Sequence, residues 1–222
     1  MAMRRVLTDA CEAFARHAQQ SVDVVAMGGI DALQRVQRGE PFDFVVLASD
    51  AIEQLAAAGH VDAATRTDLA RSQIAIAVAH GAATPDIGSE RAVREAVRRA
   101  RTVGYSTGPS GAYVMQLFAR WRIAGADGPR LVQAPSGVPV GTLIARGDVD
   151  LGFQQTSELM HVPGVDIIGP LPPDIQLATA FSAAVCTAAN DVASAKALLA
   201  YLASPAADDA KRRHGMAPMR PS

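Results

Sequence analysis

The sequence predicts an α/β protein with mainly parallel sheets, and three observations carry this prediction. Short apolar runs rich in β-branched residues alternate with helical patterns along the whole chain. Small or polar residues separate most of these segments. The 222 residues are 49 % hydrophobic and 19 % charged, which is typical of a globular chain with a real core. This length fits one large domain or two small lobes.

The first quarter of the chain shows the repeating strand, loop and helix pattern most clearly. Apolar residues recur at helical spacing from Val6 to Ala18, and a nearly continuous apolar run over 42–49 is typical of a buried parallel strand. Glycines end the preceding segments, and Ser49-Asp50 forms a helix N-cap signal. We expect a helix over 6–18, a strand over 21–29, a helix over 30–39, a strand over 42–49 and a helix over 51–59.

The same alternation continues to the C-terminus. Pro172-Pro173 marks a crossover connection, and Pro205 bends or breaks the last helix. Trp121, Cys11 and Cys186 are expected in the core. We expect strands over 72–82, 102–106, 129–135 and 148–155, helices over 90–100, 112–124, 138–147, 156–162 and 194–215, and extended chain over 164–188.

Composition excludes several classes of function. Twenty-one basic and 22 acidic residues give a net charge of −1, which argues against nucleic acid as a partner. The apolar run over 74–79 is too short to span a membrane, so no direct membrane insertion is expected. No signal peptide opens the sequence, which predicts a cytoplasmic protein as written. The five histidines lack metal-ligand spacing, and neither a metal nor a cofactor is expected.

Four loops could bind a ligand, because each follows a strand and opens a helix. They are Gly28-Gly29, Ser49-Asp50, the run from Ser106 to Gly111, and the run from Gln154 to Ser157. Ligands of open α/β sheets bind at the carboxyl ends of strands, where helix N-termini present free N–H groups. None of the four loops contains lysine or arginine. The loops therefore predict a small anion held by neutral donors.

A hydrolase is a weaker interpretation. Residues 104–108 read GYSTG, which satisfies the G-x-S-x-G pattern of a nucleophile elbow. Ser106, Asp150 and His161 or His214 could fill the order of a catalytic triad. The turn continues with Pro109 and Ser110, and the spacing from Asp150 to His161 is short for two distant loops. We therefore favour anion binding over hydrolysis.

A succession of segments, FDFVVLASDAIEQLAAAGHV, IAIAVAHGA, GYSTGPSGAYVMQLF, DLGFQQTSEL, GPLPPDIQ and KRRHGMAP, resembles bacterial extracellular solute-binding proteins of the molybdate-binding type. This resemblance implies the type 2 periplasmic-binding fold, with two lobes and a ligand cleft between them. It places lobe I at 1–79 plus 178–222 and lobe II at 80–177. It also implies a small oxyanion or carboxylate as ligand and ABC-type membrane subunits as partners.

The resemblance also assigns ligand-binding positions. Ser49, Ser106 and Ser110 match serines of the ligand loops, while Phe153 and Gln155 match a small apolar residue and a tyrosine of the molybdate binders. Glutamine at the second position suits a carboxylate ligand better than molybdate. The full set of expected ligand-binding residues is Gly28, Gly29, Ser49, Ser106, Thr107, Ser110, Gly111, Phe153, Gln154 and Gln155.

Residues 141–172 are similar to the aconitate isomerase branch of the same superfamily. Such an enzyme moves a proton across the allylic system of an unsaturated tricarboxylate and needs an acid–base group near the bound carbon. Glu158 and His80 are the candidates, with Asp50 third. The loops contain few other residues that could act as a general acid or base. A binding protein is therefore the first hypothesis and an isomerase the alternative.

The N-terminus departs from the pattern of the family, which begins with a strand and a serine-rich loop before the first helix. Here Met1-Ala2-Met3 leads directly into the helix, so that strand is missing. The neighbouring strands, 21–27 and 42–49, must then close up or recruit a strand from another copy. A true start further upstream would restore the strand and make the protein periplasmic.

Overall fold

The computed structural model describes residues 1–123 and 128–220, and the chain divides into two compact units. Unit 1 contains Met1–Ser72 and Thr179–Ser222, and unit 2 contains Gln73–Ala178. The chain crosses from one unit to the other inside strand β2 (Thr67–Ala79) and again at the start of strand β7 (Ala178–Val185). The lobe boundaries expected from the sequence were 79/80 and 177/178.

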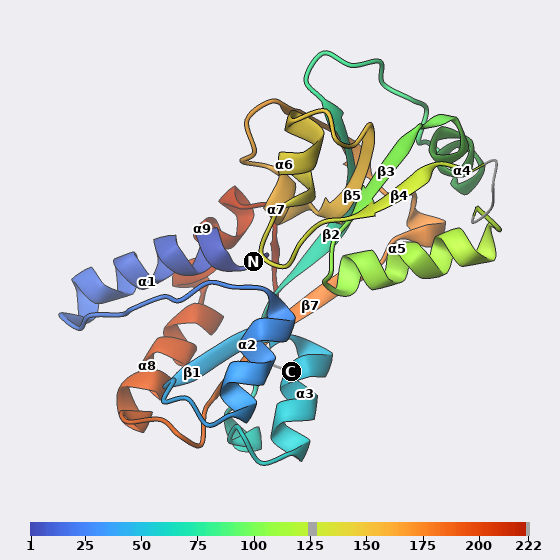
Figure 1. The fold of residues 1–222 in the computed structure, drawn as a ribbon. Helices are drawn as coiled ribbons and strands as arrows, with labels where there is room; N and C mark the ends of the chain where they lie inside the picture. The colour runs from blue at the N-terminus through green and yellow to red at the C-terminus, as the bar shows by residue number, and fades with distance from the viewer. Residues whose placement is uncertain (124–127, 221–222) are drawn as a thin grey trace. The chain divides into compact units, whose positions relative to one another are not determined.

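Unit 1 consists of a small sheet with helices on both faces (Figure 1). In the sheet, β7 lies between β1 and β2, and β8 pairs with β2. Alternate residues of β7 face opposite ways, with Ala183 in the core beneath α1, α8 and α9 and Ala184 in the core beneath α2 and α3. The remaining elements of unit 1 are α1 (Arg4–Ala18), α2 (Gly29–Gln37), β1 (Phe44–Ala48), α3 (Ser49–Ala57), η1 (Ala63–Thr65), α8 (Val192–Ala203), η3 (Pro205–Ala207), α9 (Asp208–Arg213) and β8 (Ala217–Pro218).

The strand predicted over 21–29 is wrong, because the structure has no regular element between α1 and α2. Val22 and Val24 still pack partly buried on the same core as Phe44 and Val46 of β1, so the period of two persists. Within the described residues, 21–26 make no hydrogen bond, and β1 pairs with β7 alone. The two flanking segments have therefore not closed up into a ladder, and a strand without a partner is not assigned as one.

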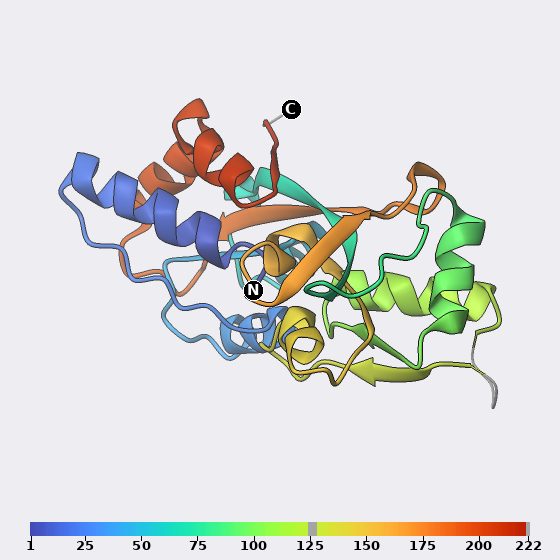
Figure 2. The ribbon, with the colours of Figure 1, turned by 90° about the horizontal axis from the view of Figure 1, so that it is seen from above.

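Unit 2 contains the second sheet, in the order β2-β5-β3-β4, with β6 also paired to β2. The ladders of β3 with β4 and β5 are parallel, while β2 runs antiparallel to β5 and β6. Helices α4 and α5 cover one face of this sheet, and α6 and α7 cover the other (Figures 1 and 2). The remaining elements of unit 2 are α4 (Glu90–Arg99), β3 (Thr102–Tyr105), α5 (Pro109–Arg120), β4 (Arg130–Gln133), α6 (Val140–Ala145), β5 (Leu151–Gln155), α7 (Thr156–Leu159), β6 (Val165–Pro170) and η2 (Pro173–Ile175).

Most of the other sequence predictions are confirmed within a few residues. The last helix is broken at Pro205 into α8, η3 and α9, and Trp121 and both cysteines are buried. The helix expected over 112–124 spans Pro109–Arg120, and residue 124 lies outside the described residues. Across the described chain, no helix is long and apolar enough to cross a membrane.

Candidate functional site

In unit 1, Ser49 opens α3 directly after β1, but its hydroxyl is already engaged. Its Oγ lies 2.6 Å from Ser182 Oγ on β7, and Ser182 Oγ donates to Asp68 Oδ1 at 2.6 Å. A hydroxyl carries a single proton, so Ser182 can only accept from Ser49. Ser49 therefore donates inward, and the anion donors left at this loop are the first N–H groups of α3.

The other unit 1 candidates are backbone positions at the start of α2. Gly28 is the N-cap of the helix, and a Cβ at Gly29 would meet only Leu47 at 3.9 Å. Asp50 turns back on its own helix, where its carboxylate accepts the N–H of Ala51 at 2.9 Å. This contact is local to the first turn of α3.

In unit 2, the loop after β3 holds two buried serines. Ser106 Oγ lies 3.0 Å from Ser110 Oγ in the first turn of α5. Two hydroxyls that share one hydrogen bond keep one proton for a further acceptor. Gly111 permits this arrangement, because a Cβ there would lie 1.7 Å from the carbonyl oxygen of Ser106. Thr107 stands half-buried in the same loop, and its hydroxyl makes no hydrogen bond within the described chain.

Strand β5 presents its residues to opposite faces of the unit 2 sheet. The ring of Phe153 packs edge-on against Phe118 at a centroid distance of 5.6 Å, so this side chain belongs to the core and not to a binding surface. Gln154 and Gln155 are both buried at the carboxyl end of the strand. Gln154 Oε1 accepts the N–H of Val140 at 2.7 Å.

Glu158 lies in the first turn of α7, immediately after β5. Burial raises the pKa of the Glu158 carboxyl. A carboxyl with a raised pKa is a stronger base when ionised and holds its proton nearer to neutral pH. Ser157 beside it has a buried Oγ with no partner in the described residues. These properties suit proton transfer at this end of β5.

His80 and Glu158 are not brought together. In the ladder between β2 and β5, Ile74 faces Gln155 and Ala77 faces Gly152, so His80 lies beyond the opposite end of β5 from Glu158. The His80 side chain is 79 % exposed, and its Nδ1 lies 2.9 Å from Asp166 Oδ1. This contact raises the pKa of His80 and leaves it as a surface ion pair.

The triad arrangement is also absent at Ser106. Strands β3 and β5 are parallel, with Val103 opposite Leu151, so Asp150 lies at the amino end of the sheet and Ser106 at the carboxyl end. Asp150 binds the guanidinium of Arg101 at 3.0 Å, which lowers the pKa of the carboxyl. The described residues also hold no group of three His, Cys, Asp or Glu that could bind a metal ion.

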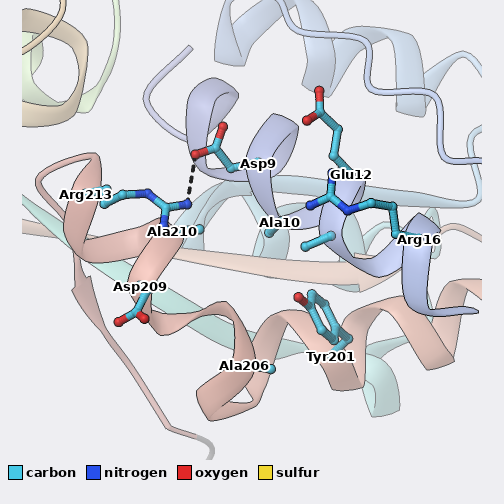
Figure 3. Close-up of a pocket in the computed structure, with 10 residues that line it drawn as sticks. Asp9, Ala10, Glu12, Arg16, Tyr201, Ala206, Asp209, Ala210 and Arg213 are labelled. Carbon is cyan, nitrogen blue, oxygen red and sulfur yellow. Dashed lines mark hydrogen bonds and ion pairs between the residues drawn. The ribbon is translucent and has the colours of Figure 1, made fainter.

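Unit 1 contains a separate groove between α1 and the C-terminal helices (Figure 3). It has a volume of about 500 Å³ and none of the expected site residues lines it. Arg213 Nη2 donates to Asp9 at 3.1 Å across one end, and His214 Nε2 lies 3.0 Å from the same carboxylate. The sequence does not signal these contacts, or those of Ser182 and Val140, because they depend on how distant segments pack.

Comparison with known proteins gives consistent matches. A family model described as bacterial extracellular solute-binding protein matches residues 1–217. Aconitate isomerase from a Pseudomonas species is 39 % identical over 186 residues, covering 83 % of this chain and 71 % of the relative. The molybdate-binding protein ModA of Azotobacter vinelandii is 25 % identical over 193 residues, covering 82 % and 73 %.

Solved structures show the same fold. The periplasmic molybdate-binding protein of Azotobacter vinelandii superimposes with a TM-score of 0.76 at 17 % identity, covering 100 % of this chain and 96 % of the other. A substrate-binding domain of a molybdenum ABC transporter from Clostridium difficile gives a TM-score of 0.71 at 14 % identity, covering 99 % and 96 %. The resemblance read from the sequence and the predicted α/β, type 2 periplasmic-binding fold are thereby confirmed. The strand directions differ from the prediction of mainly parallel sheets: β3 is parallel to β4 and β5, whereas β1–β7, β2–β5, β2–β6 and β2–β8 are antiparallel.

Proposed function

The chain belongs to the bacterial extracellular solute-binding protein family, and on this basis we propose that it binds a tricarboxylate and interconverts cis- and trans-aconitate. The observation that carries the proposal is the position of Glu158, whose carboxyl lies in the first turn of α7 directly after the carboxyl end of β5. A relative that is 39 % identical and named aconitate isomerase supports it. Simple anion binding needs only neutral hydrogen-bond donors and does not require a carboxyl group at this position.

The reaction is an allylic proton shift. In the proposed step, the Glu158 carboxylate removes one proton from the methylene carbon of cis-aconitate. The electron pair left on that carbon forms the new double bond, and the old double bond opens toward its far carbon. That carbon takes up a proton from Glu158, which returns the carboxylate to its starting state. The product is trans-aconitate, and neither an oxidant nor a second substrate is consumed.

Developing negative charge in this step spreads onto a neighbouring substrate carboxylate, which needs hydrogen-bond donors. The Ser106–Ser110 pair has one proton free to donate, and the first turn of α5 offers N–H groups without intrahelical partners. Neutral donors hold a carboxylate without the strong charge pairing of arginine. We assign these groups to substrate binding and Glu158 to proton transfer.

The test is incubation of the protein with trans-aconitate in D2O, followed by proton NMR. We expect cis-aconitate to accumulate and deuterium to enter the carbons that exchange protons. Glu158→Gln is expected to lower kcat at least about 100-fold, the lower range for a general acid–base residue, while trans-aconitate still binds. Glu95→Gln, on the outer helix α4 with a 3.7 Å ion pair to Arg98, is the matched control and should leave kcat unchanged.

A binding protein for a small oxyanion is the second candidate, because a molybdate-binding relative is 25 % identical and the loops carry neutral donors. Thermal shifts with molybdate, sulfate, citrate and both aconitate isomers separate the two functions. A ligand at 100 times its Kd stabilises the folded state by about 2.7 kcal/mol. Stabilisation by molybdate, with no turnover of either aconitate isomer, would overturn the isomerase proposal.

A further inference from the structure

The groove of unit 1 is open because small side chains form its floor. Ala10 and Ala13 of α1 line it on one side, and Ala206 of η3 and Ala210 of α9 line it on the other. Larger side chains at these positions would occupy part of its volume of about 500 Å³. Small-molecule sites in proteins typically have volumes of about 300–1,000 Å³. The groove is therefore large enough for a small organic ligand, and its floor is apolar.

At one end of the groove, the acidic side chains already have partners. Asp9 accepts from Arg213 Nη2 at 3.1 Å, and His214 Nε2 lies 3.0 Å from the same carboxylate (Figure 3). Asp209 Oδ1 lies 3.4 Å from Arg212 Nη1 on the same helix. Both carboxylates at this end therefore already have a guanidinium partner within the protein.

The other end carries charged groups that have no partner. Glu12 and Arg16 lie one helical turn apart on α1, and both are exposed. This spacing normally favours an ion pair, yet neither side chain makes an ion pair or a hydrogen bond within the described residues. The Tyr201 hydroxyl likewise makes no hydrogen bond in the described chain, and it points toward α1 (Figure 3). One cation, one anion and one hydroxyl are thus available at this end.

From these observations we propose that the groove binds an α-amino acid with an apolar side chain. Such a molecule carries a carboxylate and an ammonium group on the same carbon, which matches a guanidinium and a carboxylate one helical turn apart. The ligand carboxylate accepts from Arg16 and from the Tyr201 hydroxyl, and the ligand ammonium donates to Glu12. The apolar side chain lies over the alanines of the floor, where removal of apolar surface from water is favourable.

The charges that line the groove select against ligands of a single charge sign. A dicarboxylate would bring a second negative charge close to Asp9, Glu12 and Asp209, and a simple amine would leave Arg16 without a partner. None of the lining residues belongs to the candidate substrate site. The groove is therefore a second ligand site, and its occupancy can be measured without aconitate turnover.

The ligand test uses leucine and two analogues that each lack one charge. In 15N–1H NMR titrations of the full chain, leucine should shift the backbone amides of residues 9–16 and 201–213. Leucinamide lacks the carboxylate, and N-acetylleucine lacks the ammonium group. Each analogue should bind at least about tenfold more weakly, because a hydrogen bond to a charged group contributes at least this factor. Glutarate, with two carboxylates, should bind no better than the analogues.

Two variants test whether leucine occupies this groove. Arg16→Gln should weaken leucine binding at least about tenfold, whereas Arg4→Gln, an exposed position of the same helix outside the groove, should leave it unchanged. Ala206→Leu places a larger side chain in the groove from an exposed position and should abolish binding. Ala197→Leu, an exposed position of α8 outside the groove, is its control. Circular dichroism checks that each variant is folded.

Four outcomes would overturn the proposal. Absence of amide shifts at millimolar leucine would show that the groove does not bind an amino acid. Equal affinity for leucine and N-acetylleucine, or tighter binding of glutarate than of leucine, would identify an anion site instead. Unchanged leucine binding by a folded Ala206→Leu variant would place the ligand elsewhere on the protein.

Discussion

Strand β5 of unit 2 and the segment 21–26 of unit 1 both come just before a helix, but they differ in the hydrogen bonds that their backbone N–H and C=O groups make. Strand β5 lies between β2 and β3, and all five of its residues are buried. Segment 21–26 packs Val22 and Val24 on the unit 1 core but makes no hydrogen bond within the described chain. Apolar periodicity thus placed both segments on a core, and only the availability of a partner made one of them a strand.

The close contacts between elements differ in kind between the two units. In unit 2, glycines let other atoms approach the backbone closely, with valine and isoleucine side chains at Gly104 and Gly152 and the carbonyl of Ser106 at Gly111. In unit 1, Asp9 of α1 contacts Arg213 of α9, and Asp208 contacts Lys211, Arg212 and Arg220 within the C-terminal segment. One of these ion pairs, between Asp9 and Arg213, therefore links the first and last segments of unit 1.

Hydrogen exchange should show the largest difference between the units. We expect the amides of 22–26 to exchange at least about 10³ times faster than those of Leu151–Gln155, a difference of about 4 kcal/mol in opening free energy, because exposed or unpaired amides need little opening. Mass spectrometry after pulsed labelling measures both segments in one sample. Equal protection of the two segments would show that 21–26 is paired in solution, and would contradict the difference in hydrogen bonding between this segment and β5.

Replacing the buried carboxylate of Asp208 in unit 1 should lower the unfolding free energy by a similar amount. The Asp208 side chain is 6 % exposed and lies 3.6 Å from Lys211 Nζ, whose side chain is 1 % exposed. Arg220 lowers the pKa of Asp208, and burial lowers the pKa of Lys211. Asp208→Asn leaves a buried cation without its counter-charge, and we expect a loss of about 3–5 kcal/mol in unfolding free energy by urea denaturation.

Two further variants test whether charge is the cause. Asp209→Asn, on the same helix with a side chain that is 85 % exposed, should change stability by less than about 0.5 kcal/mol. Lys211→Met added to Asp208→Asn removes the orphaned cation and should recover most of the loss. A double variant no more stable than Asp208→Asn would show that packing, and not charge, holds this end of unit 1.

Sequence reasoning found nearly every helix and strand, because each carries its own local signal. The run over 42–49 is apolar enough to require burial. A proline in the interior of a helical pattern, such as Pro205, breaks the helix. The exception, 21–29, carried the same signal but lacked a neighbour with which to pair. Local pattern predicts which residues are buried, whereas strand formation also requires a second segment.

The sequence predicted which types of residue form the candidate site, but it predicted the role of each residue less well. Serines after strands were found as candidates, but the inward hydrogen bond of Ser49 depends on Ser182, 133 residues away. Likewise, Gln154 is oriented by Val140 through the packing of α6, and His80 is separated from Glu158 by the antiparallel register of β2. These roles depend on tertiary contacts that a single sequence does not display.

The smallest expected effect compares the two glycines in the first turns of α2 and α5. A Cβ at Gly111 would lie 1.7 Å from the carbonyl oxygen of Ser106, and backbone atoms cannot move aside as a flexible side chain can. A Cβ at Gly29 would meet only Leu47 at 3.9 Å, an ordinary van der Waals contact. Gly111→Ala should therefore lower the unfolding free energy by about 1–3 kcal/mol, the range for overpacking.

Gly29→Ala should instead be neutral or slightly stabilising, because alanine restricts the unfolded chain more than glycine does. Urea denaturation of both variants beside the wild-type protein gives the comparison directly. The Gly111 variant should also weaken aconitate binding, since Ser106 must move for the new methyl group to fit. Equal stability of the two variants would mean that the loop after β3 yields as readily as the one before α2. The close packing seen at the other glycines of unit 2 would then not extend to its serine loop.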